Sequence, residues 1–512
     1  MNKEDLIEYL NTHDMDVQSA RAMFLFAELV YQSYADSCVV GGKNFSPVIF
    51  NFTAGRFYQL IDRGVINEVA RRVYEDFVAD NDSLDNLIAG HRSYEFLMDE
   101  VWGKIKSRLK EADLETLKGF YSELLFLAER WWHYAAIGED KGGLIERELA
   151  PKMAQKHGVL VGEIIEAIGV LSHPKELAFF TKERKDFYKL CLFVLSNKSV
   201  HEEVINEDVD ALKEHDDYVE RVNEFAKKYF WKDTDFYERR VVGLRSVTRE
   251  VKKEVVKHGV KQINKEMAHI DEGLAAIRKM KKEVLGRFEL DEEDKGIILF
   301  AEKMTEWQDF RKLGMMKHLY YLFALLEALA KKLGASYEDL AYSTIEELEK
   351  IMKGEGKVNK EAIIRRKGGT VFVFEKEKPL VELKSDASRA VIDYIEREVE
   401  GELKGTVASV GKDRVKRVKG KVRVVINPLK ERFLPGEILV TSMTRVEFVP
   451  IMKKAKAIIT DEGGLSCHAA IVSRELGVPA IIGVRRATKV LNSGDIVELD
   501  METGVISKKL SK

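Results

Sequence analysis

The amino-acid sequence predicts a multidomain protein that combines a large, mostly α-helical N-terminal domain with a small β/β/α domain at its C-terminal end. The chain has 512 residues, enough for about two to four domains at roughly 100–200 residues each. Apolar residues recur at three- and four-residue spacing through most of the chain before residue 366, which is typical of helices. We therefore predict a helical domain over residues 1–366, a β-hairpin, helix and linker over residues 367–404, and a small α/β domain over residues 405–512.

Composition excludes several classes of function. The 83 Lys and Arg residues nearly balance the 86 Asp and Glu residues, so bulk charge favours neither nucleic acid nor an anionic membrane as a partner. The three cysteines are far apart, which is typical neither of a disulfide framework nor of a zinc site. The first residues, MNKEDLIEYLNTHD, lack the apolar core of a signal peptide, and no apolar run approaches about 20 residues. We expect a cytoplasmic protein with no bound metal and no membrane span.

One segment of the helical part has a regular heptad spacing. Apolar residues between Val256 and Ile277 follow one another in alternating steps of four and three residues. This pattern predicts one long helix that packs along a bundle, with a coiled coil to a partner as the alternative.

The segment that follows the helical part changes character. Gly368 and Gly369 precede TVFVFEKEKPLVEL, whose alternation predicts a β-hairpin. Ser385 and Asp386 then cap a predicted helix, and the stretch from Gly401 marks a boundary.

The C-terminal domain contains short strands and few helices. We expect strands at KVRVVI, EILVTS, AKAIIT, PAIIG and DIVELD, and helices at VEFVPIMKKA and CHAAIVSREL. The second helix should end at Gly477, with Pro479 just beyond it, and a strand follows. His468 is therefore predicted to begin the helix of a β–loop–α–β unit.

The residues around His468 suit phosphate chemistry. Gly463 and Gly464 allow a tight turn and a close approach to a ligand, and Ser466 is placed to cap the helix. The first N–H groups of a helix lack internal partners and attract anions. A neutral imidazole can act as a nucleophile and become phosphorylated. A lone histidine at a helix start is more often a cap or a surface residue. Arg474 lies six residues after His468 and points away from it by about 120° on a helix, so we expect Arg474 to form a structural ion pair.

The full stretch TDEGGLSCHAAIVSRELGVPAIIG closely resembles the phosphohistidine swivelling domain of phosphoenolpyruvate-utilising enzymes. The resemblance rests on Thr460, Gly463, Gly464, Ser466, His468-Ala469-Ala470-Ile471, Arg474 and Gly477-Val478-Pro479-Ala480. It implies that His468 carries a phosphoryl group, that Ser466, the glycines and Thr460 stabilise it, and that the domain swings between two remote active sites. The sequence departs from the family at Val410 and Val446, where proline is usual.

The N-terminal part more weakly resembles the helical domain of rifampicin phosphotransferase and related synthase-like proteins. The resemblance rests on ERWWHYAAIGEDKGG, EWQDFRKL and LGASYEDLAYSTIEELEKIM, and it implies an acceptor site. Trp131, Trp132, His133 and Lys141 could line that site, because aromatic rings suit apolar substrates and a lysine beside glycines suits phosphate. The alternative is a buried helix end followed by a polar turn.

These observations predict one component of a split phosphotransferase similar to phosphoenolpyruvate synthase or pyruvate phosphate dikinase. The helical pattern does not fit an ATP-grasp domain, and the sequence lacks a Gly-x-x-x-x-Gly-Lys-Ser/Thr phosphate loop. We therefore expect no cofactor on this chain, ATP and Mg²⁺ on a separate ATP-grasp protein, and a small-molecule acceptor. A regulatory or scaffold protein with a retained swivelling domain is the alternative, and a homo-oligomer stays open.

Overall fold

The structure, a computed structural model, divides the chain into two compact units. It describes all residues except 21–22, 37–44, 54–55, 139–140, 175, 235–237, 398–402, 427, 429–430, 445–447, 465–466, 485 and 510–512. The N-terminal unit comprises Met1–Glu139, Glu176–Glu272 and Trp307–Tyr394, and the C-terminal unit comprises Asp140–Lys175, Gly273–Glu306 and Ile395–Lys512. Both units are discontinuous in sequence, whereas the predicted domains are consecutive segments. The observed fold class is nonetheless the expected one, α plus α/β and multidomain.

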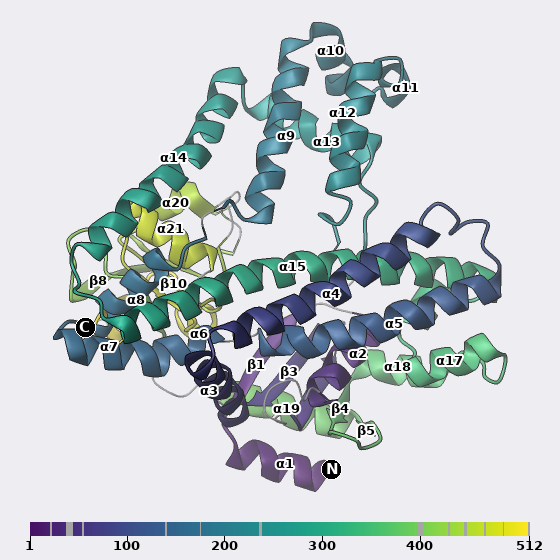
Figure 1. The fold of residues 1–512 in the computed structure, drawn as a ribbon, viewed down its shortest axis with the longest axis horizontal. Helices are drawn as coiled ribbons and strands as arrows, with labels where there is room; N and C mark the ends of the chain where they lie inside the picture. Colours follow the sequence, from purple (N-terminus) through teal and green to yellow (C-terminus); the bar gives the residue numbers. More distant parts are fainter. Residues whose placement is uncertain are drawn as a thin grey trace. The chain divides into compact units, whose positions relative to one another are not determined.

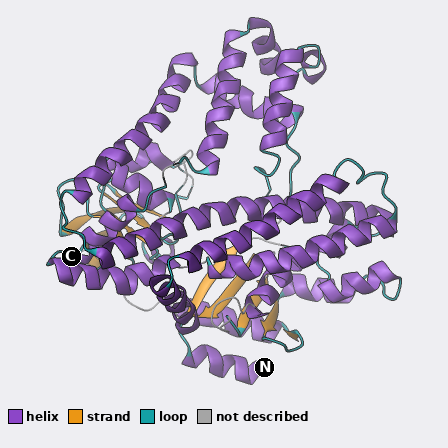
Figure 2. Ribbon diagram, viewed as in Figure 1, coloured by secondary structure: helices purple, strands orange, loops and turns teal. Residues whose placement is uncertain are grey.

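A five-stranded antiparallel sheet lies in the N-terminal unit (Figure 2). Its order is β1-β3-β2-β4-β5, formed by β1 (Met15–Ala20), β3 (Arg56–Asp62), β2 (Val48–Thr53), β4 (Thr370–Phe374) and β5 (Val381–Leu383). The hairpin predicted after residue 368 is confirmed as β4 and β5. The uniformly helical pattern expected before residue 366 is corrected by β1, β2 and β3. Four of the first five residues of β2 are apolar and all five are buried, so β2 has no polar face to reveal a two-residue period.

Helices surround this sheet and extend the N-terminal unit. They are α1 (Lys3–Thr12), α2 (Phe24–Asp36), α3 (Arg63–Ala79), α4 (Asp82–Ile105), α5 (Leu114–Ile137), α16 (Tyr337–Ala341), α17 (Ile345–Lys353), α18 (Lys360–Gly368) and α19 (Ser385–Arg397). The long helix α15 (Glu292–Leu333) contributes its C-terminal half, which runs beside α4 and α5 (Figure 1). Trp307 of α15 donates to His91 of α4 at 2.6 Å, and Trp132 of α5 donates to His318 of α15 at 3.0 Å. Buried imidazoles therefore join the three helices.

A second group of helices has its own core. It contains α9 (Phe179–Ser196), α10 (Lys198–Asn206), α11 (Val209–Leu212), α12 (Asp216–Lys228) and α13 (Leu244–Lys257), followed by α14 (Val260–Leu285). The heptad prediction of one long helix is confirmed from Val260 to Ile277, which lie on α14, but Val256 lies on α13, because His258 has an extended backbone and separates the two helices. Val256 and Val260, on either side of this break, are 66% and 46% exposed. Apolar spacing alone did not reveal the break.

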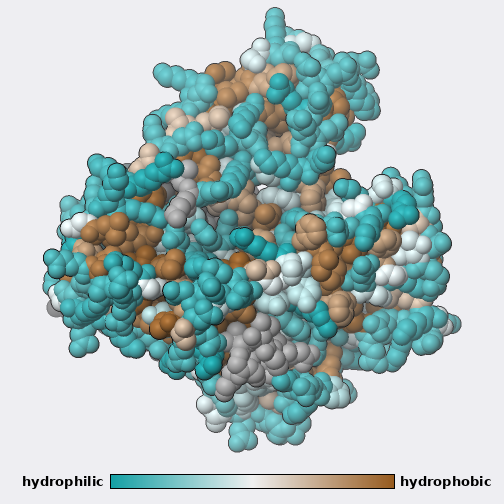
Figure 3. Space-filling model, in the orientation of Figure 1, coloured by the Kyte–Doolittle hydropathy of each residue, from teal (hydrophilic) through white to brown (hydrophobic). Residues whose placement is uncertain are grey.

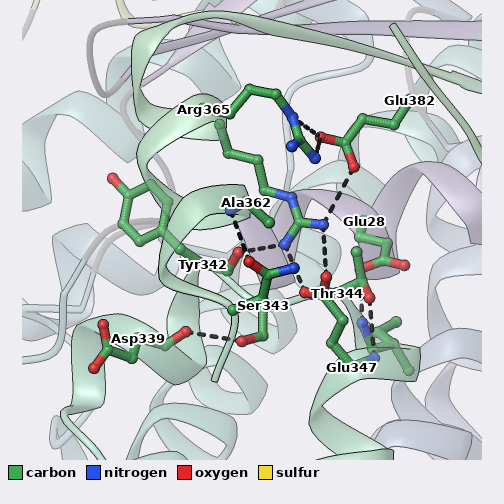
Figure 4. Close-up of polar contacts among 12 residues, drawn as sticks. Glu28, Asp339, Tyr342, Ser343, Thr344, Glu347, Ala362, Arg365 and Glu382 are labelled. Carbon is green, nitrogen blue, oxygen red and sulfur yellow. Dashed lines mark hydrogen bonds and ion pairs between the residues drawn. The ribbon is translucent and has the colours of Figure 1, made fainter. Parts of the chain in front are cut away.

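Polar contacts join three segments of the N-terminal unit around Tyr342, Glu347 and Glu382 (Figure 4). Arg366 is 2% exposed and contacts Glu347 through two hydrogen bonds, of 2.6 and 3.0 Å. It also donates to Glu382 of β5 at 3.3 Å and to the carbonyl of Tyr342 at 2.9 Å. Nearby, the carboxylate of Glu28 accepts from the backbone N–H of Ile345 at 2.8 Å, and burial raises its pKa to about 8.

The C-terminal unit contains a mixed eight-stranded sheet of order β6-β13-β12-β8-β9-β10-β11-β7. The strands are β6 (Leu403–Lys404), β7 (Thr406–Ser409), β8 (Arg417–Val424), β9 (Ile438–Thr441), β10 (Ala457–Thr460), β11 (Ala480–Ile482), β12 (Ile496–Asp500) and β13 (Val505–Lys509). Strands β8 to β11 are parallel, and all five strands predicted from the sequence are confirmed. We call residues 403–509 the C-terminal module.

Both faces of the central strands of this module are buried. Along β9, Ile438 and Val440 belong to one core cluster, while Leu439 belongs to the other. The second cluster also includes Ala469 and Ala470 of α21 (His468–Leu476), and short helices α20 (Val449–Met452) and α22 (Ala487–Val490) complete the module. Burial on both faces explains why these strands are apolar throughout, as parallel strands generally are.

The C-terminal unit also includes helices from earlier in the chain. They are α6 (Lys141–Leu144), the π-helical turn η1 (Ile145–Leu149), α7 (Ala150–His157), α8 (Val161–Leu171), and parts of α14 and α15. Asp294 of α15 is 1% exposed and accepts from Lys156 and His157 of α7 at 3.1 and 2.9 Å. These contacts fix α7 against the start of α15.

Hydrophilic side chains cover most of the face of the molecule in Figure 3, with hydrophobic patches between them. Among the described residues, no helix is both long and apolar enough to cross a lipid bilayer.

Candidate phosphohistidine site

A glycine turn connects strand β10 to helix α21 (Figure 1). Thr460 ends β10 and is completely buried, and its hydroxyl donates to the carbonyl of Glu462 at 2.7 Å. Gly463 has a φ of +124°, a conformation that side-chain-bearing residues rarely adopt. The glycine predicted to allow a tight turn therefore does so, and the threonine hydroxyl fixes the start of that turn.

His468 is the first residue of α21, so the predicted position of the histidine at a helix start is confirmed. Its side chain lies outside what the structure describes, as does Ser466. The prediction that Ser466 caps the helix is wrong, because the N-cap is Cys467. The Cys467 backbone is extended, and its sulfur accepts from the N–H of Ala470 at 3.4 Å. Burial raises the pKa of the Cys467 thiol, which disfavours the nucleophilic thiolate.

Aspartate 461 holds the turn against the rest of the module. The carboxylate of Asp461 accepts from both the backbone N–H and the hydroxyl of Thr488, the N–H at 3.0 Å. Its own N–H donates to the carbonyl of Thr441 at 3.0 Å, and Val484 donates to the carbonyl of Thr460 at 2.9 Å. The turn is thus connected on both sides, and we call residues 460–468 the histidine loop.

The start of α21 can stabilise negative charge. The backbone N–H groups of the first turn lack intrahelical acceptors, and the helix dipole places partial positive charge there. The thiol of Cys467 accepts from the N–H of Ala470 at the third position of α21, and the N–H of Ala469 also acts on this thiol. Such a helix start suits a phosphoryl group carried by the first residue of the helix.

Arg474 has a structural position in this unit. It is 7% exposed, and its Nε donates to the carbonyl of Ala408 in β7 at 3.0 Å. Its guanidinium also packs on Gly169 of α8, where an added Cβ would lie 2.6 Å from Cζ. Glu166, almost one turn before Gly169 on α8, interacts electrostatically with Arg474. The expectation of a structural ion pair is consistent with these contacts.

Helices η1 and α8 contact the module at residues that sequence reasoning missed. Glu146 of η1 accepts from the hydroxyl of Thr406 at 2.7 Å, and Glu163 of α8 accepts from Arg414 at 2.9 Å. Gly162 of α8 packs so closely on β7 that an added Cβ would lie 3.2 Å from Val407. The sequence gives no sign that Glu146 contacts Thr406. The glycines of α8 are a weak sign that this helix packs closely on another element.

The four predicted acceptor residues divide between the two units. Trp131 and Trp132 are core side chains of the N-terminal unit, 0% and 3% exposed, and His133 is half-buried beside them. Lys141 begins α6 in the C-terminal unit, and its side chain lies outside the described part of the chain. An acceptor role for these residues stays a prediction, but the two indoles do not line an open surface.

The indoles belong to a buried polar cluster of the N-terminal unit. His91 lies 4.4 Å from the ring of Trp131, and desolvation lowers the pKa of His91 well below its ordinary value. Desolvation likewise lowers the pKa of His318 to about 3, so both imidazoles are neutral at physiological pH. Lys317 donates to Glu95 at 2.9 Å and also to Asp99. Neutral imidazoles that accept from indoles form a packed core, and in the described part of the chain no cluster of His, Cys, Asp and Glu could hold a metal ion.

Comparisons with known proteins find similar sequences for the segment that contains the histidine loop. The family described as "PEP-utilising enzyme, mobile domain" matches residues 433–504. A probable phosphoenolpyruvate synthase of Archaeoglobus fulgidus is 43% identical over 142 residues, which are 27% of this chain and 18% of that protein. The phosphoenolpyruvate synthase of Pyrococcus furiosus is 40% identical over 145 residues, 28% of this chain and 17% of that protein.

A rifampicin phosphotransferase of Bacillus cereus matches over a longer segment. It is 29% identical over 250 residues, which are 46% of this chain and 28% of that protein. The chain thus spans less than a third of the length of each of these relatives. Residues 433–504, which include the glycine turn, His468 and α21, therefore form a mobile domain of the PEP-utilising enzyme family.

Proposed function

We propose that this protein is a phosphotransferase in which His468 carries the phosphoryl group. The observation that carries the proposal is the position of His468 as the first residue of α21, directly after the turn at Gly463, within the segment that matches the mobile domain. A helix start supplies N–H groups for phosphoryl oxygens, and an imidazole supplies the nucleophilic nitrogen. Relatives named as synthases and as a phosphotransferase support the same chemistry.

The donor in this proposal is ATP, bound with Mg²⁺ to a separate ATP-grasp protein. The imidazole nitrogen of His468 attacks the transferred phosphorus, the bond to the ATP-derived leaving group breaks, and a phosphohistidine forms. The mobile domain then presents the phosphoryl group to an acceptor at the helical part of the chain. The acceptor oxygen forms a new bond to phosphorus, the P–N bond breaks, and neutral His468 returns.

The test is phosphorylation of the full chain by radiolabelled ATP and Mg²⁺, with and without a co-purified ATP-grasp protein. We expect acid-labile label only in the presence of both proteins, and none in His468→Ala. Equal labelling of wild type and His468→Ala would overturn the carrier role. Labelling by ATP without the second protein would overturn the separate donor. If neither variant is ever labelled and His468→Ala leaves partner binding unchanged, the scaffold alternative holds instead.

A further inference from the structure

Helical turn η1 brings a carboxylate to the histidine loop within the C-terminal unit. Glu146 is half-buried, and its Oε2 accepts from the hydroxyl of Thr406 at 2.7 Å. A Cβ placed on Gly464 would lie 3.9 Å from the other oxygen, Oε1. One oxygen of Glu146 is therefore anchored on β7, while the other faces the loop that leads to His468.

A second contact of Glu146 is electrostatic and involves the residue next to His468. Burial is the main cause of the raised pKa of the Cys467 thiol, and the negative charge of Glu146 raises that pKa further. The carboxylate thus lies close enough to influence a side chain at the start of α21.

Glu146 is close in sequence to Lys141 and its glycines and lies near the histidine loop. The sequence predicted a role in phosphate chemistry for each of these two segments separately. Lys141, Gly142 and Gly143 were predicted to suit phosphate, and Lys141 begins α6, five residues before Glu146. Between them the helix changes from α to π geometry, and Glu146 lies in this π-helical turn. Such turns are rare and frequently occur at functional sites.

The other carboxylates of the loop are less suited to proton transfer. Asp461 is 7% exposed and holds Thr488 through both of its oxygens. Glu462 precedes the turn and is exposed to solvent. Among these three carboxylates of the described loop and its contacts, Glu146 alone is contributed by a helix outside the module. An acceptor that enters between η1 and the histidine loop would therefore meet Glu146.

We propose that Glu146 accepts the proton of the attacking hydroxyl group when His468 gives up its phosphoryl group. This inference rests on the proposed function and adds the residue that completes its second step. The acceptor oxygen forms a bond to phosphorus, its proton moves to the Glu146 carboxylate, and the P–N bond breaks, which returns its electron pair to the imidazole. A positioned general base contributes typically about 100- to 10,000-fold to such a step.

The hydroxyl of Thr406 has a supporting role in this step. Its hydrogen bond holds one oxygen of the carboxylate and so fixes the direction of the other. Thr406 is thus a positioning residue, and its effect should depend on the presence of Glu146. Water can take the place of the acceptor, so the step can be followed without knowing the natural acceptor.

The experiment separates formation of phosphohistidine from its loss. The full chain is phosphorylated with potassium phosphoramidate, the reagent is removed, and release of inorganic phosphate to water is followed by ³¹P NMR. We expect Glu146→Gln to be phosphorylated on His468 as fully as wild type, yet to release phosphate at least about 10-fold more slowly. The ratio of the wild-type release rate to that of Glu146→Gln should fall toward one as the pH is lowered, while uncatalysed acid hydrolysis of the P–N bond raises both rates.

Two further variants act as matched controls. Glu148→Gln changes a carboxylate of the same π-helical turn and should release phosphate at the wild-type rate. Thr406→Val alone should release phosphate more slowly than wild type. Thr406→Val combined with Glu146→Gln should release it no more slowly than Glu146→Gln alone. Glu146→Asp should restore part of the rate and its pH dependence.

The outcomes distinguish this inference from the proposed function. If phosphate forms on His468 and leaves at equal rates from wild type and Glu146→Gln, the role of Glu146 is overturned while the carrier role stands. If phosphoramidate labels wild type no more than His468→Ala, the proposed function itself is overturned.

Discussion

Replacement of Gly463 by alanine should disrupt the histidine loop and leave the rest of the protein unchanged. The φ of +124° at Gly463 lies in a region where an L-residue is strained, which costs about 1–3 kcal/mol. The new Cβ would also lie 2.6 Å from Sγ and 3.1 Å from Cβ of Cys467, the N-cap of α21. Such an overlap costs about a further 1–3 kcal/mol, for a total of about 2–6 kcal/mol.

The neighbouring glycine offers a matched control. Gly464 does not have a positive φ, and among the described residues a Cβ added there would meet only Glu146, at the ordinary contact distance of 3.9 Å. Gly464→Ala should therefore change the stability of the loop by less than about 1 kcal/mol. The two variants differ by one residue in position and share the same chemical change.

The assay must report on the C-terminal module itself. The five tryptophans all lie outside residues 403–509, so the module has no tryptophan of its own. Hydrogen–deuterium exchange of peptides from β10, α21 and β11 measures local opening instead. A loss of about 2 kcal/mol raises exchange about 30-fold, because about 1.4 kcal/mol is tenfold. Equal exchange in Gly463→Ala and Gly464→Ala would refute the reasoning that backbone strain and the contact with Cys467 define this loop.

Three predictions concern the N-terminal unit. Burial raises the pKa of Glu28 from 4.5 to about 8, so the folded state keeps a proton that the unfolded state loses. The free energy of unfolding should therefore fall by about 5 kcal/mol as the pH rises from about 4.5 to about 8. Glu28→Gln should remove this slope in urea unfolding measured from pH 5 to pH 9, and a slope that persists would contradict the assignment to Glu28. Arg366→Met should destabilise the folded protein by about 3 kcal/mol. This is the low end for a broken buried ion pair, because Glu347 is 31% exposed. Adding Glu347→Gln to the same chain should recover part of the loss. Trp307→Phe leaves the ring nitrogen of His91 without its donor and should lower the free energy of unfolding by about 1–3 kcal/mol. An unchanged midpoint of urea unfolding would show that this hydrogen bond contributes nothing to stability.

The histidine loop could be predicted from the sequence because its determinants are local. Gly463 permits the turn, and Gly477 has a left-handed conformation at the end of α21, where the sequence placed the end of the helix. A glycine in this conformation and a proline after it act within a few residues of the helix they end. The cap was the exception, because serine and cysteine can both accept from a helix N–H, and only the backbone angles of Cys467 decided between Ser466 and Cys467.

The sequence by itself thus determined the strands of the C-terminal module, the helix that begins at His468 and the glycine turn before it. Only the tertiary structure decided which distant segments meet. Strand β2 pairs with β4 across more than 300 residues, and Glu146 meets Thr406 across 260. Such contacts depend on the packing of whole elements, which no periodicity within one segment encodes. The burial of Trp131 and Trp132 was decided in the same way, because their spacing along α5 is the same whether the indoles pack in a core or line a pocket.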